Sequence, residues 1–236
     1  MSKQVNHLSQ AGRTRREFLR IAAAAVAAPY VITSTALGAD DKPAASDRIV
    51  MGGIGIGNMG AGDMGRFLGD NQVQYVAVCD VVKGKRDNAQ NRVNGKYGDT
   101  GCQSYNDFRE LLARTDIDAI HTACPDHWHA LITVAACRSG KDVYCQKPLS
   151  LTIRDGRAMV DAARMYNRVV SGGSQRVLGD TGGIARQCWS GECGQIKEVY
   201  VSCGGPSWPC NLPGEPVPEG LDWDMWLGPA PWAPYH

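Results

Sequence analysis

A glycine pattern near residue 55 constrains the fold of this chain more than any other feature. Residues 55–60 read GIGNMG, which is the spacing G-x-G-x-x-G. They follow an apolar run, Arg48–Ile54, that we predict to be a strand, and they lead into a helix predicted over Met59–Gly69. Between a strand and a helix, this spacing is typical of the turn that binds the pyrophosphate of a dinucleotide. The sequence therefore predicts a dinucleotide-binding domain.

Each glycine of the pattern has a separate physical role. Gly55 allows the tight turn, and Gly57 lets the backbone approach the pyrophosphate. Gly60 lets the helix pack closely against the strand. The N-terminus of the helix then offers backbone N–H groups and a positive dipole end to the phosphates.

Asp80 follows a second predicted strand, Val73–Cys79, about twenty residues beyond the glycines. A carboxylate here accepts hydrogen bonds from both hydroxyls of the adenosine ribose and repels a 2′-phosphate, which favours NAD over NADP. The alternative is a surface aspartate that caps the next helix. Lys83, Lys85 and Arg86 lie just beyond and could bind a phosphate, so NADP stays open as a cofactor.

Predicted strands and helices alternate up to about residue 173. The further strands are expected at Ala119–Ala123, Asp142–Cys145 and Val169–Ser171. The further helices are expected at Val82–Tyr97, Phe108–Ala113, Trp128–Ser139 and Ile153–Tyr166, the last capped by Thr152 with Asp155 three residues on. This alternation predicts an α/β fold, a doubly wound parallel sheet with helices on both faces.

The pattern changes after Gly173. A helix is expected over Thr181–Ser190 and a strand over Ile196–Ser202, whereas Gly204–His236 is rich in Pro, Gly and Trp without a periodic element. Such a long irregular segment is unusual inside a compact domain. We expect four parts: a signal peptide (1–38), a linker (39–47), a Rossmann domain (48–175) and the incomplete start of an α+β substrate domain (176–236).

The first residues have the composition of an export signal. Arg15 and Arg16 precede an apolar run, Ile21–Ile32, that is shorter than the about 20 residues a membrane-spanning helix needs. Paired arginines indicate the twin-arginine route, with cleavage after Gly38. The alternatives are a mitochondrial-type presequence and a chance arginine pair. We therefore expect a periplasmic protein with no stable membrane span after cleavage.

Charge and cysteine content exclude some other classes. The formal net charge is +1 and the Lys and Arg residues are dispersed, so nucleic acid is not an expected partner. The nine cysteines include no C-x-x-C pair, and we predict mostly free thiols. His121, Cys124, Asp126, His127 and His129 resemble a zinc-ligand cluster, but they divide between a strand and a helix start. We expect no metal and interpret the cluster as the ligand-binding edge of the sheet.

Lys147-Pro148 follows the predicted strand Asp142–Cys145 at the same edge of the sheet. The usual explanation of such a lysine is plain exposure. This one lies where a nicotinamide ring is expected, and the proline is compatible with a cis peptide bond.

Several segments together resemble one family, the glucose–fructose oxidoreductase and inositol dehydrogenase family. They are the glycine segment 53–60, the segment VAVCD at 76–80, PDHWH at 125–129, GKDVYCQKPLS at 140–150 and WLGPAPW at 226–232. The resemblance implies an NAD(P)-dependent oxidoreductase acting on a sugar or cyclic polyol. It places Lys147 beside the nicotinamide, as the catalytic residue, and His129 near the ribose. The remaining cofactor-binding residues expected along this stretch are Asn58, Met59, Cys124 and Gln175.

Two departures from the family pattern stand out. Gln146 replaces the usual Glu before Lys147, which removes a carboxylate that would stabilise the ammonium and so favours a neutral base. The family's second domain supplies an Asp and a His to the substrate, and these would lie beyond His236. We therefore expect a truncated or split reading frame that binds NAD(H) but is catalytically incomplete.

Two other functions remain open. The first is an NAD-dependent glycoside hydrolase of the same fold, and the second is a non-catalytic nucleotide-binding remnant. For full-length relatives, the resemblance implies homo-oligomers.

Overall fold

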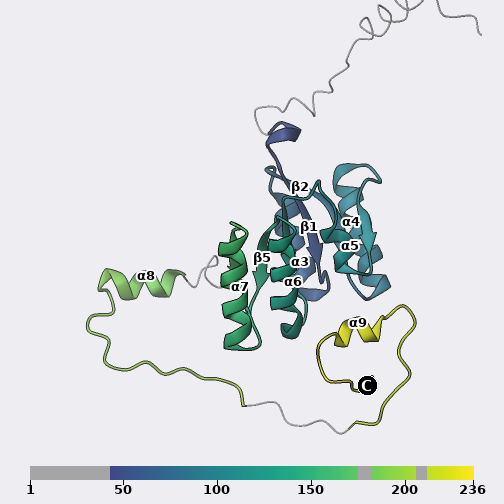
Figure 1. Ribbon diagram of the computed structural model, residues 1–236. Coiled ribbons are helices and arrows are strands. Elements are labelled where there is room, and N and C mark those ends of the chain that lie inside the picture. Colours follow the sequence, from purple (N-terminus) through teal and green to yellow (C-terminus); the bar gives the residue numbers. More distant parts are fainter. Residues whose placement is uncertain (1–42, 175–181, 206–211) are drawn as a thin grey trace, which may run out of the picture.

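The computed structural model describes residues 43–174, 182–205 and 212–236 (Figure 1). The predicted signal peptide, residues 1–38, lies outside the described residues, and so do Gln175 and Cys210. Export, cleavage and the role of Gln175 therefore stay predictions.

A six-stranded sheet forms the centre of the fold. Its strands are β1 (Ile49–Ile54), β2 (Val73–Cys79), β3 (Gln103–Tyr105), β4 (Ala119–Thr122), β5 (Asp142–Gln146) and β6 (Val170–Gly173). All neighbouring strands pair in parallel, in the order β3-β2-β1-β4-β5-β6. The order reverses between β1 and β4, which is where an open α/β sheet binds its ligand.

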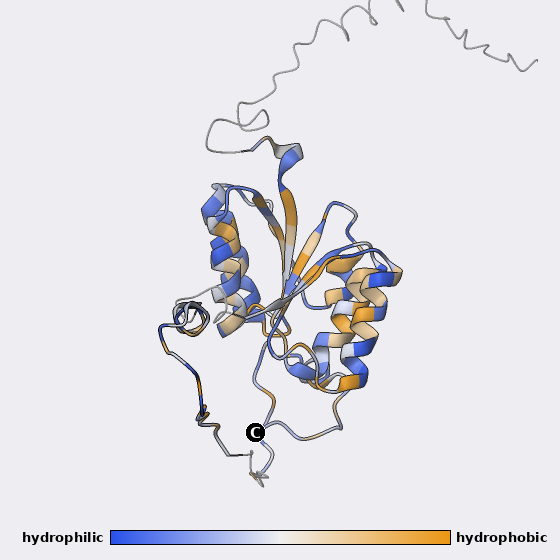
Figure 2. Cartoon of the chain, turned by 90° about the vertical axis from the view of Figure 1, so that its left-hand side faces the viewer, coloured by the Kyte–Doolittle hydropathy of each residue, from blue (hydrophilic) through white to orange (hydrophobic). Residues whose placement is uncertain are grey.

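Helices cover both faces of this sheet (Figure 2). They are α3 (Asn58–Gly69), α4 (Lys83–Tyr97), α5 (Phe108–Leu112), α6 (Asp126–Arg138) and α7 (Ile153–Met165), after a single 3-10 turn, η1 (Ala45–Asp47). Two further helices, α8 (Gly182–Ser190) and α9 (Trp223–Leu227), follow the last strand. The predicted doubly wound α/β fold is confirmed.

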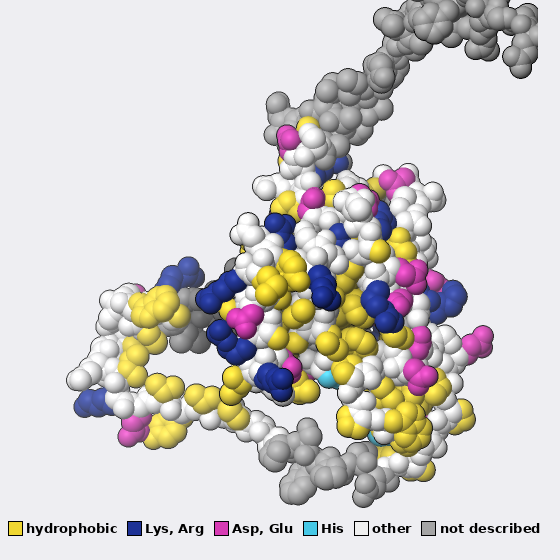
Figure 3. Space-filling view, viewed as in Figure 1, with side chains coloured by type: hydrophobic (Ala, Val, Ile, Leu, Met, Phe, Trp, Pro, Cys, Tyr) yellow, Lys and Arg dark blue, Asp and Glu magenta, His cyan; other side chains and the backbone are white. Residues whose placement is uncertain are grey.

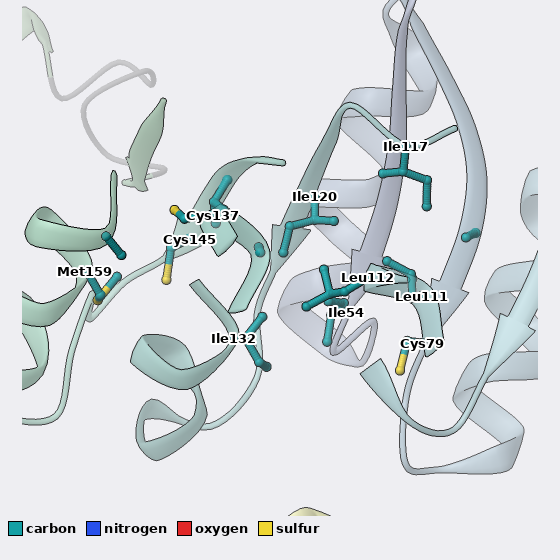
Figure 4. Close-up of a cluster of buried hydrophobic side chains, with 14 residues drawn as sticks. Ile54, Cys79, Leu111, Leu112, Ile117, Ile120, Ile132, Cys137, Cys145 and Met159 are labelled. Atoms are coloured by element: carbon teal, nitrogen blue, oxygen red, sulfur yellow. The ribbon is translucent and has the colours of Figure 1, made fainter. Parts of the chain in front are cut away.

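Two apolar cores hold the helices to the sheet. One joins β1 and β2 to α3 and α4 through residues such as Met64, Tyr75 and Val93. The other lies on the opposite face, where side chains from α5, α6 and α7, such as Leu111, meet strand side chains such as Ile120 of β4 (Figure 4). Because both faces of the sheet are covered, the central strands β1 and β2 are mostly apolar and show no regular alternation with polar residues.

The capping pattern predicted for α7 is present. Thr152 Oγ1 accepts from the Asp155 N–H at 3.1 Å, and the Asp155 carboxylate accepts from the Thr152 N–H at 3.1 Å. This reciprocal pair satisfies two backbone donors that the helix itself leaves without partners. It explains why α7 begins where the sequence predicts.

One predicted strand is wrong. Residues 195–205 form no strand, and Tyr200 there is 90% exposed. The apolar alternation over Ile196–Ser202 suits a strand, but backbone groups need a neighbouring strand to pair with. The described residues contain no strand that pairs with this stretch.

Residues after Gly204 hold more structure than the sequence predicts. Within this Pro/Gly-rich stretch, α9 forms, and Asp222 caps it by accepting from the Met225 N–H at 3.0 Å. The segment returns to the Rossmann domain, so that α9 lies below α5 and α6 in Figure 1. Since the helix has only five residues, tertiary contacts and not periodicity must fix it.

On the face of the molecule that Figure 3 shows, Lys and Arg side chains are scattered among acidic ones, while apolar side chains gather on the C-terminal segment. Among residues 43–174, 182–205 and 212–236, no helix combines the length and apolarity needed to span a bilayer.

Candidate functional site

The carboxyl ends of β1, β2 and β4 border a cavity of about 300 Å³. It lies at the point where the strand order reverses. Gly55 and Gly57 of the glycine turn, Asp80 and Cys124 all line it. The other polar or charged lining residues are Asn58, Lys85 and Asn106.

Two positions of the glycine turn have no room for a side chain. Gly55 has a φ of +73°, and a Cβ there would lie 2.8 Å from the backbone N of Cys124. A Cβ on Gly60 would lie 2.0 Å from the carbonyl oxygen of Gly55. Both contacts are with backbone, so neither can be relieved by rotating a side chain. The turn therefore requires glycine at these two positions, as the motif predicts.

The start of α3 suits an anion. Its N-cap, Gly57, supplies no side-chain acceptor, and the first turn contains no acidic residue. Backbone N–H groups at a helix start that lack an internal partner, together with the helix dipole, favour a bound phosphate. Gly57 also lines the cavity, which places this helix end on the cavity wall.

Asp80 lies at the end of β2 with only 8% of its surface exposed. Its Oδ1 accepts from the Val82 N–H at 2.9 Å, so it also stabilises the turn into α4. Burial raises the pKa of this carboxyl, and hydrogen bonds from the Val82 and Ile56 backbone and the charge of Lys85 oppose that rise. Of the two functions considered for Asp80, its position on the cavity wall suits the cofactor role. The alternative, a surface aspartate that caps the next helix, is wrong, because Asp80 is buried and α4 has no side-chain cap.

The three cations after Asp80 have different environments. Lys83 pairs with Asp87 at 2.5 Å on the surface, and Arg86 donates to the Asp80 carbonyl and to Asn106. Lys85 alone among these three lines the cavity, and its Nζ would lie 3.1 Å from a Cβ on Gly57. The sequence does not distinguish them, because the direction of each side chain depends on the turn that Asp80 caps.

The loop after β5 carries Lys147, which is exposed, and the Lys147–Pro148 peptide bond is cis. The Lys147 N–H donates to Gln146 Oε1 at 2.8 Å, and Gln146 Nε2 donates to Asp63 Oδ2 at 2.6 Å. On the other side, His129 Nδ1 donates to the Pro148 carbonyl at 2.6 Å. These bonds fix the backbone on both sides of Lys147.

Asp63 is a functional candidate that sequence reasoning missed. It lies on α3, 2% exposed, and it accepts from the buried amide of Gln146. Its only sequence signal is a carboxylate on the buried face of a helix, which is rare without a partner. A Glu at position 146 would place a second carboxylate beside that of Asp63. The neutral amide of Gln146 instead donates a hydrogen bond to Asp63.

The predicted residues His121 and His129 do not converge. His121 is fully buried inside the sheet, where its Nδ1 lies 2.7 Å from the Tyr75 hydroxyl, and burial lowers its pKa to about 4. His129 faces the Pro148 loop, and its Nε2 is buried with no partner among the described residues. No group of three or more His, Cys, Asp or Glu side chains in the described ranges is arranged to hold a metal ion.

The residues present fit a dinucleotide. The glycine turn leaves space that a Cβ would fill, the helix start favours phosphate, and Asp80 provides a hydroxyl acceptor on the cavity wall. Lys147, His129 and Asp63 gather at the next strand ends, outside the cavity lining.

Comparison with known proteins identifies the family of residues 49–174. Residues 49–174 match the model of the oxidoreductase family with an NAD-binding Rossmann fold, GFO_IDH_MocA. The chain is 31% identical over 168 residues to the alpha-N-acetylgalactosaminidase of Shewanella oneidensis, covering 63% of this chain and 36% of that protein. It is 32% identical over 110 residues to the inositol 2-dehydrogenase of Salmonella typhimurium, covering 46% of this chain and 31% of that protein. It thus spans about a third of the length of these curated relatives.

Solved structures share the fold. An NAD-binding oxidoreductase from Klebsiella pneumoniae superposes with a TM-score of 0.50 at 26% identity, covering 62% of this chain and 40% of that one. The myo-inositol 2-dehydrogenase of Lactobacillus plantarum gives a TM-score of 0.56 at 24% identity, covering 63% and 43%. The scyllo-inositol dehydrogenase of Lactobacillus casei, solved with NAD(H) and scyllo-inositol, gives 0.56 at 22% identity, covering 63% and 43%.

Proposed function

Because the chain belongs to the oxidoreductase family with an NAD-binding Rossmann fold, we propose that it binds NAD(H) at the carboxyl edge of its sheet for hydride transfer on a sugar or cyclic polyol. The observation that carries this proposal is the alignment of three features along one sheet edge. They are the glycine turn, the buried Asp80 and the fixed loop of Lys147.

The bound nicotinamide supplies the hydride acceptor. The role of this chain's residues is to orient it and to move a proton. Lys147 takes the proton from the substrate hydroxyl, and its backbone is held by Gln146 on one side and by the His129–Pro148 bond on the other.

Asp80 makes NAD the preferred cofactor. A charged hydrogen bond contributes about 1.5–3 kcal/mol, so Asp80→Ala should erase a preference for NAD(H) over NADP(H) of about tenfold or more. Asp87→Ala is the matched control, because it removes the same charge from a surface residue outside the cavity. Fluorescence titration with both cofactors measures the effect. Equal affinity for the two cofactors in the unmutated chain would contradict the preference.

The activity test uses the full chain, NAD and a panel of inositols and aldoses, with NADH absorbance as the signal. We expect reduction of NAD with at least one of these compounds, and loss of it in Lys147→Ala with cofactor binding retained. Lys96→Ala, on the last turn of α4, is the control. Turnover that survives Lys147→Ala would contradict the role of this lysine. Bound NAD without turnover on any compound would contradict hydride transfer by this chain.

A glycoside hydrolase is the second candidate, favoured by the relatives named glycosyl hydrolase family 109 proteins at 32% identity. Such an enzyme would oxidise its sugar transiently and regenerate NAD. Release of nitrophenol from a nitrophenyl N-acetylgalactosaminide, with no net NADH, would support it. Net accumulation of NADH would exclude it.

We also propose export to the periplasm by the twin-arginine route, supported by Arg15 and Arg16 before the apolar run Ile21–Ile32. The double change Arg15→Lys and Arg16→Lys keeps the charge and should retain the precursor in the cytoplasm. Continued appearance of a mature form outside the cytoplasm would refute this route.

A further inference from the structure

The wall of the cavity includes a segment far from the Rossmann core in sequence. Met225 and Trp226, on α9, line the same cavity as Gly57 and Asp80. They lie outside residues 49–174, which match the family model. Figure 1 shows α9 next to the lower ends of α5 and α6.

The first attachment of this segment is to the turn that follows Asp80. The Lys83 N–H donates to the Gly220 carbonyl at 2.7 Å, and the Asp222 N–H donates to the Val81 carbonyl at 3.1 Å. The segment is thus tied directly beside the carboxylate expected to bind the adenosine ribose.

A second attachment is a side-chain hydrogen bond to Asn106. Asn106 Nδ2 donates to Asp222 Oδ2 at 2.7 Å, while the other carboxylate oxygen of Asp222 caps α9 through the Met225 N–H. Asn106 itself lines the cavity. Asp222 therefore links the fold of α9 to its position over the site.

The third attachment is at the start of α6. The Trp226 carbonyl accepts from His127 Nε2 at 3.1 Å and from Trp128 Nε1 at 3.2 Å. Gly228 follows with a φ of +50°, and a Cβ there would lie 2.0 Å from the Trp128 ring. Only a glycine lets the chain pass this close to the ring.

The position of the cavity suits the adenosine half of a dinucleotide. It spans the ends of β1 and β2 and the start of α5, whereas Lys147, expected beside the nicotinamide, does not line it. Phe108 and Trp128, whose ring centroids are 5.4 Å apart, add aromatic surface next to Met225 and Trp226. Adenine is a flat aromatic ring, and stacking on aromatic side chains is a favourable way to bind it.

We propose that residues 220–228 form an adenosine clasp, in which Met225 and Trp226 contact the adenosine half of the bound dinucleotide and slow its release. This rests on the proposed function, because it requires NAD(H) to bind at the glycine turn. The clasp makes the C-terminal segment part of the cofactor site.

The test compares the double variant Met225→Ala/Trp226→Ala with Trp232→Ala in the full chain. Trp232 follows the clasp in sequence but does not line the cavity. Titrations use NAD, ADP-ribose and nicotinamide mononucleotide, and stopped flow measures NADH release. We expect about tenfold weaker binding of NAD and ADP-ribose in the double variant, with NADH release faster by a similar factor. Mononucleotide binding and the Trp232→Ala control should not change.

The possible outcomes separate this inference from the proposed function. If the unmutated chain binds NAD and the double variant binds it equally well, the clasp is wrong and the proposed function stands. If the unmutated chain binds no NAD, both fail. Should the double variant not fold, Asp222→Ala provides the second test, since it removes the cap of α9 and the bond to Asn106. Unchanged ADP-ribose affinity in Asp222→Ala would also overturn the clasp.

Discussion

Two glycines on one helix should respond in opposite ways to the same substitution. A Cβ on Gly60 would lie 2.0 Å from the Gly55 carbonyl oxygen, where ordinary contact begins near 3.4 Å, so α3 must move away from β1 by about 1.4 Å. Overpacking against backbone costs about 1–3 kcal/mol, occasionally more, and we expect Gly60→Ala to lose about 3 kcal/mol. Gly62 is exposed on the same helix with nothing within 4 Å of such a Cβ. Gly62→Ala should therefore gain about 0.5–1 kcal/mol from helix propensity.

Urea unfolding of the full chain and both variants measures the two changes, with the slope of the transition as a check on two-state behaviour. Gly60→Ala should also weaken NADH binding, because the displaced helix carries the phosphate-binding N–H groups. Gly62→Ala should leave binding unchanged. Equal stability of the two variants would refute the packing of α3 on the glycine turn.

Three further changes test two buried side chains and one helix cap. Burial lowers the pKa of His121 to about 4 from 6.5, so the folded state favours the neutral ring. The stabilisation that neutral His121 contributes is fully present above pH 6.5 and is lost as pH falls through 4, by about 3 kcal/mol at pH 4. Urea unfolding at pH 7 and pH 4 measures this loss, and the difference in unfolding free energy between the two pH values should be smaller in His121→Asn. Asp63→Ala leaves the buried Gln146 amide without its acceptor and should cost about 1–3 kcal/mol, whereas Asp63→Asn should recover part of this in the same measurement. Thr152→Ala removes the cap of α7 and should cost about 1 kcal/mol by thermal or urea unfolding, and no change would contradict the capping pair.

The elements that the sequence predicts correctly are those with a local signal. Apolar runs such as Val73–Cys79 lie in the sheet because both of its faces are covered, and the Thr152 cap begins α7 as expected. The strand β3 (Gln103–Tyr105) was missed because its three residues are polar or half-buried and carry no apolar run. It exists because it extends the sheet beside β2.

Among the residues of the candidate site, too, only those with a local signal can be predicted from the sequence. Gly55 and Asp80 follow from motif spacing, because the chain connects the strand end directly to the turn. Lys85 could not be distinguished from its neighbours. Asp63 belongs to no local motif, because its partner Gln146 lies 83 residues away along the chain. Trp226 reaches the cavity because residues 220–226 bond to the segments after β2 and β3 and to the start of α6, which no local pattern encodes.

Calorimetric titration of NADH into the full chain tests the central claim most directly. Gly57→Val is the matched variant, since a Cβ there meets only the flexible end of Lys85, so the fold is expected to persist while the backbone can no longer approach a phosphate. We predict one saturable NADH site in the unmutated chain and binding at least tenfold weaker in Gly57→Val. No binding in the unmutated chain, or equal binding in a folded Gly57→Val, would contradict a dinucleotide site at the glycine turn.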